Sequence, residues 1–232
     1  AIKDNLEEMS REHGSPVVLS PVIDTWMKDP ENDDIRTDTL ASLKNSKTFL
    51  RGLNAQEKMA LAGNIIIART NGEIGRNDTG AIVINIDKFK EGSQRDTAMS
   101  YSILDLENQY DVRQFTNGIS SRTGLKIIWR QDTLQVAIRE NVGVSPSEME
   151  GNAAKMMQVY LPKLERALNS MSPVQKAAIN NSGGVIYINH VRRDHSSDIP
   201  PNGVNAVIFS QEITDAELRD RIAADFRDGQ RN

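Results

Sequence analysis

The first 72 residues carry apolar side chains at the spacing of amphipathic helices. Ser20 and Pro21 form a typical helix start, because serine can cap the first turn and proline needs no amide partner there. Asn54 with Glu57 three residues later has the pattern of a capping box, and the apolar segment 55–70 that follows is expected to be a central helix. These patterns predict that residues 1–72 are wholly helical.

Short β-branched runs at 81–86, 185–189 and 204–209 predict buried strands. Segment 125–140 predicts a β-hairpin, because two β-rich runs, Leu125–Trp129 and Thr133–Ile138, flank a short polar turn. The second run alternates apolar and polar residues, as a half-exposed strand does.

A long apolar stripe follows the capping box that Ser145 and Glu148 form around Pro146. Its members recur at helical spacing: Met149, Ala153, Met156, Tyr160, Leu164, Ala167 and Met171. Pro162 interrupts the stripe and predicts a kink or a break in the helix. We favour a core position for the methionines over a soft partner-binding face, because a long amphipathic helix must bury its apolar side.

The order of these elements predicts an α+β fold, with an N-terminal helical layer packed on or beside a mixed, largely antiparallel sheet of four to five strands. The Gly- and Asn-rich segment 71–80 is the only plausible boundary. It would separate a helical region, 1–72, from an α+β region, 73–232, although one continuous domain fits the pattern as well. No internal repeat is evident.

Composition narrows the function classes further. The chain of 232 residues has 28 basic and 32 acidic side chains, a net charge of −4 and no cysteine. Disulfides, thiolate zinc sites and cysteine nucleophiles are therefore excluded, and the mild acidity argues against general nucleic-acid binding. No apolar run is long enough to span a membrane, and the visible start lacks the apolar run of a signal peptide. The chain begins with alanine, so a secreted origin and the compartment stay open.

The polar segment 190–198 is the strongest candidate for chemistry, since it holds two of the three histidines directly after a predicted strand. His190 or His195 could act as a general base that Asp194 or Asp198 orients. The alternative is a solvated loop whose charges pair with one another.

The same segment offers a metal site and an anion site. His190, His195 and Asp198 are ligands of the kind that a divalent metal takes. Arg192 and Arg193 could hold a phosphate or a carboxylate.

Other polar motifs favour structural roles. Segment 69–80 could form an anion-binding nest, but its predicted order of helix, loop and strand does not match known phosphate loops, so a connecting loop is favoured. Glu148 and Glu150 fit the start of a helix. Ser120 and Ser121 are expected in a turn, because no histidine is placed to activate them.

The predicted helices from Leu161, the strands that follow and the final helix have an order similar to the lead-in of zinc peptidases of the lethal-factor kind. Those enzymes carry His-Glu-x-x-His on a helix, which supplies two zinc ligands and a general base. The corresponding helix here reads Ala216-Glu217-Leu218-Arg219-Asp220, without either histidine. The resemblance therefore implies no such zinc site in this chain.

Two functions remain. We favour a protein-interaction module, either a secreted or injected effector domain or a subunit of a larger assembly, with another protein as its partner. The alternative is a metal- or histidine-assisted hydrolase that acts on an anionic substrate through segment 190–198. No cofactor is predicted, and a divalent metal enters only with the second function.

Overall fold

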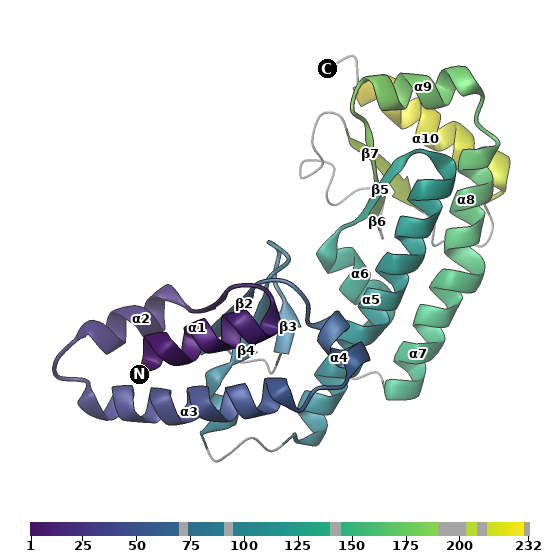
Figure 1. Cartoon of the computed structure of the whole chain (residues 1–232). Coiled ribbons are helices and arrows are strands. Elements are labelled where there is room, and N and C mark those ends of the chain that lie inside the picture. The colour runs from purple at the N-terminus through teal and green to yellow at the C-terminus, as the bar shows by residue number, and fades with distance from the viewer. Residues whose placement is uncertain (70–73, 91–94, 140–144, 190–202, 208–212, 230–232) are drawn as a thin grey trace. The chain divides into compact units, whose positions relative to one another are not determined.

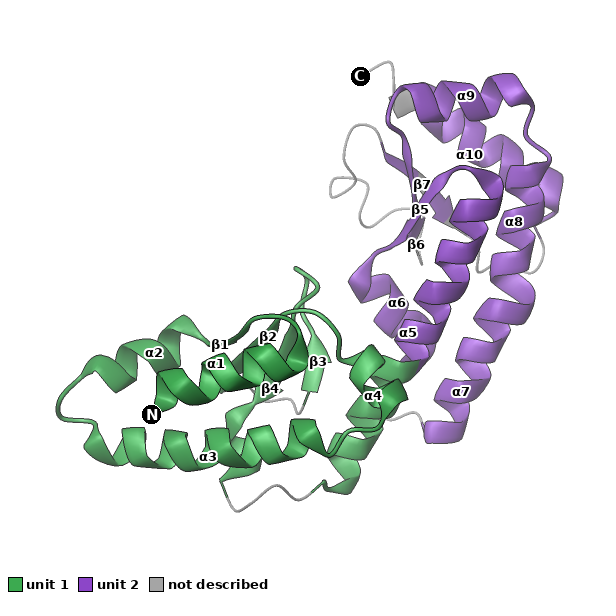
Figure 2. Ribbon diagram, viewed as in Figure 1, with its two compact units in different colours: residues 1–107 green, residues 108–232 purple. Residues whose placement is uncertain are grey.

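A computed structural model describes residues 1–69, 74–90, 95–139, 145–189, 203–207 and 213–229. It combines helices with a mixed four-stranded sheet, which confirms the α+β class (Figure 1). The chain divides into two compact units, residues 1–107 and 108–232 (Figure 2). This division lies inside one helix, α5 (Thr97–Thr123). The boundary at segment 71–80, between a helical region and an α+β region, stays a prediction.

The described residues of unit 1 form four helices ahead of α5, four strands and a 3₁₀ turn. The helices are α1 (Ile2–His13), α2 (Pro21–Lys28), α3 (Asp33–Arg51) and α4 (Ala55–Ala60). The strands are β1 (Val17–Leu19), β2 (Ile65–Ala68), β3 (Ile74–Arg76) and β4 (Ile82–Asn85), and the 3₁₀ turn is η1 (Ile86–Phe89). The sheet has the order β1-β2-β4-β3, with only the β3–β4 pair antiparallel.

The prediction that residues 1–72 are wholly helical is wrong at two places. Strand β1 follows the end of α1 at Gly14. Strand β2 lies within segment 55–70, where the sequence predicts one long helix. Ile65 and Ile67 are fully buried in β2, and Gly63 before them has φ +100°. A β-branched run after a glycine of positive φ favours a buried strand, and the helix ends at Ala60 for that reason.

Unit 2 contains a second sheet, with the order β5-β6-β7 and both pairs parallel. Its strands are β5 (Lys126–Trp129), β6 (Val185–Asn189) and β7 (Gly203–Val207). Its other elements are α6 (Gln131–Arg139), α7 (Pro146–Lys155), the π-helix η2 (Met156–Tyr160), α8 (Leu161–Asn169), α9 (Pro173–Asn181) and α10 (Asp215–Gly229). The expected antiparallel pairing is wrong here, because helices connect β5 to β6 and parallel strands need such a crossover.

The predicted hairpin at 125–140 is also wrong, because its second run forms α6. Leu134, Ala137 and Ile138 are all buried at helical spacing, while Val136 is 44% exposed. Six residues that alternate in polarity fit a strand, but the same residues satisfy the i, i+3, i+4 pattern of a helix. The side chain of Gln131 donates to Gln109 Oε1 at 2.8 Å and ties the start of α6 to α5.

The stripe from Met149 to Met171 lies in the core of unit 2, as predicted, since all seven of its members are at least 94% buried. The break expected at Pro162 takes the form of the π-helix directly before it. Leu161 N–H donates to Met156 O, five residues back, instead of to the carbonyl four residues back. The helical turn before Pro162 therefore contains one extra residue, at the place where the proline ring would clash with the preceding turn.

The two units share an order of elements that the sequence does not reveal. Each begins with a helix that ends in a glycine of positive φ, Gly14 or Gly124, and continues into the first strand of its sheet. Helices then lead to a second strand, preceded by Gly63 or Gly183, also with positive φ. A third parallel strand, β4 or β7, and a helix complete each unit, and unit 1 has in addition the antiparallel β3 before β4 and the 3₁₀ turn η1 after it. Helix α5 is both the last helix of unit 1 and the first of unit 2.

We expect Gly184→Ala to destabilise unit 2. A Cβ at this position would lie 2.8 Å from Ile179 Cγ2 and 2.9 Å from the Ile179 carbonyl oxygen, which belongs to the backbone and cannot simply rotate away. The free energy of unfolding, measured by urea denaturation, should fall by about 1–3 kcal/mol.

Gly151→Ala in α7 is the matched control. Nothing lies within 4 Å of a Cβ there, so the variant should gain about 0.5–1 kcal/mol from the helix preference of alanine. Equal effects of the two substitutions would contradict the close approach at Gly184.

Candidate functional site

The strongest sequence candidates lie outside the described residues. They are His190, Arg192, Arg193, Asp194, His195 and Asp198. Their place in the chain is after β6, the central strand of the second sheet. In the described part of the chain, no three His, Asp or Glu side chains gather as a metal site.

The other polar motifs have structural roles. Ser145 N–H donates to Glu148 Oε2 at 2.7 Å, and hydrogen bonds from Ser145 lower the pKa of Glu148, as a capping box should. Ser120 and Ser121 lie in the last helical turn of α5 and not in a loop turn, and Ser120 Oγ donates to Leu125 O at 2.5 Å.

Segment 69–80 is more than a connecting loop, because residues 74–76 form β3. Beyond this strand, Asn77 Oδ1 accepts hydrogen bonds from Thr79 N–H and Ala81 N–H at 3.1 and 3.0 Å. The backbone amides of this turn are thus bonded to a side chain, which leaves Thr79 and Ala81 unable to form an anion nest.

A groove along the outer edge of β1 is one candidate site in unit 1. It has a volume of about 800 Å³ and lies between α1 and α2. Its lining is mostly apolar: Ile2, Leu6, Val17, Val18, Leu19 and Met27, with Lys3, Glu7, Ser10 and Asp24. Strand β1 is at the edge of the sheet, so one side of its backbone faces no other strand in the part of the chain that the structure describes.

The hydrogen bonds of β1 show which backbone groups are open. Pro16 O accepts from Ile65 N–H and Ser20 N–H donates to Ile67 O, so alternate residues, including Val18, face β2. Val17 and Leu19 therefore face outward.

The outward backbone groups of Val17 and Leu19 differ in their hydrogen bonding. The Ser10 hydroxyl accepts from Val17 N–H at 2.8 Å and donates to Leu6 O at 2.7 Å. The outward N–H of Val17 is therefore already hydrogen-bonded within the chain. The outward N–H and C=O of Leu19 have no hydrogen-bond partner among the described residues. One residue of the edge is thus open to an added strand.

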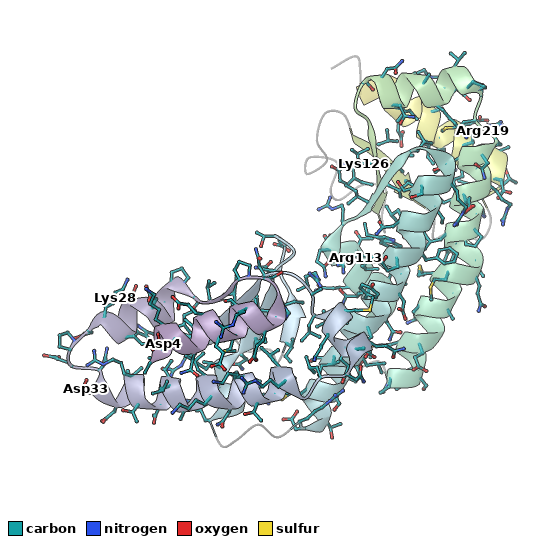
Figure 3. All side chains as sticks on the ribbon, in the orientation of Figure 1. Asp4, Lys28, Asp33, Arg113, Lys126 and Arg219 are labelled. Carbon is teal, nitrogen blue, oxygen red and sulfur yellow. The ribbon has the colours of Figure 1, made fainter. Side chains whose placement is uncertain are left out.

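The charges at the groove pair with one another. Lys3 Nζ lies 3.8 Å from Glu7 Oε1, and Lys28 Nζ lies 2.8 Å from Asp24 Oδ2. Figure 3 labels Lys28 on α2 and Asp4 on α1, two exposed charged residues of the helices that border the groove. The groove consequently offers apolar surface with little net charge.

A separate cavity of about 380 Å³ lies on the other face of α1, against α3 and α4. Its lining combines apolar side chains with four basic groups and one acid: Met9, Leu50, Leu53, Leu61 and Ala62, with His13, Lys47, Arg51, Lys58 and Glu12. The His13 ring donates from Nε2 to Gly63 O at 2.8 Å, since a carbonyl oxygen can only accept.

Ion pairs between α1 and α3 neutralise two of these cations. Lys47 Nζ donates to Glu8 Oε2 at 2.9 Å, and Arg51 bonds Glu12 through Nε and Nη2 at 2.8 and 2.5 Å. The hydrogen bond from Lys47 lowers the pKa of Glu8, and the hydrogen bond from Arg51 lowers the pKa of Glu12. The same contacts raise the pKa of Arg51, so this side chain stays charged.

Sequence reasoning missed both sites, although part of the signal was present. The run Pro16-Val17-Val18-Leu19 is short, apolar and bounded by Gly14 and Ser20, which is a strand pattern. Its position at the edge of the sheet depends on distant residues 65–67, and no local pattern gives it.

Comparisons with known proteins give no relative. No protein-family model matches the chain, and neither a curated protein nor a solved structure matches it significantly. Within the described ranges, no helix has the length and apolarity needed to cross a membrane.

We expect Arg51→Gln to raise the pKa of Glu12. In the wild type this pKa lies below the ordinary range of a glutamate. The ion pair therefore stabilises the fold above the pKa of a free glutamate, and this stabilisation is lost as the pH falls through the lowered pKa. NMR titration of the glutamate carboxyl carbons measures the change directly.

Arg122→Gln provides the control, because Arg122 holds Glu165 by a similar pair of hydrogen bonds at 2.9 and 2.8 Å in unit 2. It should raise the pKa of Glu165 and leave that of Glu12 unaltered. A Glu12 titration that does not respond to Arg51→Gln would refute the ion pair.

Proposed function

We propose that this chain is a protein-interaction module that binds an extended, apolar segment of a partner protein along β1. The observation that carries the proposal is the outward N–H and C=O of Leu19 at the open edge of a sheet, beside an apolar groove. An extended segment would form two main-chain hydrogen bonds with Leu19 and place alternate side chains in the groove.

The neighbouring residues limit what such a segment can be. Ser10 occupies the outward groups of Val17, and α2 begins with Ser20 and Pro21 directly after the strand. The main-chain pairing is therefore short, and most of the affinity must come from apolar side chains between α1 and α2. Because the charged groups at the groove pair with each other, an uncharged segment fits better than an acidic or basic one.

An effector domain or a subunit of a larger assembly could each use a groove of this kind. The proposal includes both of these roles, because the groove determines the chemistry of the segment that binds and not the protein that supplies it.

A displayed library of random 12-residue peptides tests the proposal. Panning against the full chain should enrich peptides with alternating apolar residues and no net charge. Val18 is 47% exposed on β1, so Val18→Glu should keep the fold and weaken the best peptide at least tenfold in fluorescence anisotropy.

Val174→Glu is the matched control, because this valine is 78% exposed on α9, in the other unit, and should leave the affinity unchanged. Methylation of single peptide nitrogens, one at a time, should also reveal a position that pairs with Leu19 O. Failure to enrich any peptide, or equal affinity for wild type and Val18→Glu, would reject the groove as a docking site.

The hydrolase alternative retains one supporting observation. Segment 190–198 directly follows β6, and ligands of parallel sheets commonly bind beyond the carboxyl ends of the strands. We propose His190, His195 and Asp198 as its metal ligands if this function applies.

A thermal-shift screen with zinc, manganese, calcium and common nucleotides tests this alternative. A ligand that binds only the native state must raise the melting temperature, and His190→Ala should abolish a metal-induced rise. His13→Ala, which removes the histidine outside the segment, should preserve it. A flat response to all three metals would eliminate the metal-assisted form of the alternative.

A further inference from the structure

The cavity between α1, α3 and α4 has the composition of a small-ligand site. Its volume of about 380 Å³ falls within the range of ligand pockets, and Met9, Leu53 and Leu61 supply an apolar floor. These three side chains are at most 7% exposed, so the floor is held rigidly by the core of unit 1.

The charges around this floor do not cancel. Lys47 forms an ion pair with Glu8, and Arg51 forms an ion pair with Glu12. Lys58 on α4 also lines the cavity, and its side-chain ammonium has no ion-pair or hydrogen-bond partner within the described residues. The cavity thus joins an apolar interior to one uncompensated positive charge.

We propose that this cavity binds a small amphipathic carboxylate, with its apolar chain over Met9, Leu53 and Leu61 and its carboxylate on the Lys58 ammonium. An apolar chain gains from leaving water in this cavity, and a charged hydrogen bond to Lys58 selects an anion over a neutral head group. His13 Nε2 is bonded to Gly63 O, so this nitrogen is not free for the ligand. The site shares no lining residue with the β1 groove and is independent of peptide binding there.

Octanoate is the probe, and 1-octanol is its neutral counterpart. In titrations followed by NMR, octanoate should bind about two- to fivefold more tightly than 1-octanol, the range expected for a charged contact at an exposed position. The Met9 methyl signal should move on binding, while that of Met149, fully buried in unit 2, should not.

Lys58→Met should reduce octanoate affinity by the same factor of about two to five and leave 1-octanol binding unchanged. Lys44→Met is the control, because Lys44 is an exposed lysine of α3 that does not line the cavity. Val18→Glu should not alter octanoate binding, which separates this test from that of the peptide groove.

The proposal is overturned by any of three results. These are the absence of saturable octanoate binding, equal affinity for octanoate and 1-octanol, and binding that leaves the Met9 signal unmoved. Unchanged octanoate affinity in Lys58→Met would equally overturn the assignment of the head group.

Discussion

Helix α1 depends on polar contacts along two sides, and both candidate binding sites of unit 1 depend on its position. Toward the sheet, the Ser10 hydroxyl joins the helix to Val17 of β1. Toward α3, Glu8 and Glu12 meet Lys47 and Arg51, and Met9 is buried between these contacts. Each side of the helix therefore borders a cavity whose walls are fixed by hydrogen bonds as well as by apolar packing.

Parallel pairing sets the architecture of each unit. Two adjacent parallel strands cannot be joined by a tight turn, so the chain must travel through helices between β1 and β2 and again between β5 and β6. Gly14, Gly63, Gly124 and Gly183 have positive φ and lie between the end of a helix and the start of a strand. Residues with a Cβ adopt this conformation at a cost. Both units need helical connections between adjacent parallel strands, and this requirement accounts for their shared order of elements. No repetition of residues is evident in the sequence.

Local features of this structure could be predicted from the sequence, and non-local ones could not. The caps at Ser20, Asn54 and Ser145 form as expected, because each involves residues within one turn. The polarity of segment 133–138 suits both the helix period and the strand period, so the sequence predicts a strand where burial in the folded chain selects a helix. The open edge at Leu19 was not predictable, because it depends on which strand lies next to β1. The histidine segment remains a prediction.

The continuity of α5 has a consequence for dissecting the chain. This 27-residue helix buries Met99 and Ile103 in its first part and Val112 and Ile119 in its second. A cut between residues 107 and 108 would divide this helix, and each fragment would keep only part of it together with apolar side chains that are buried in the intact chain. Fragments intended for separate expression should therefore overlap, each retaining the whole helix.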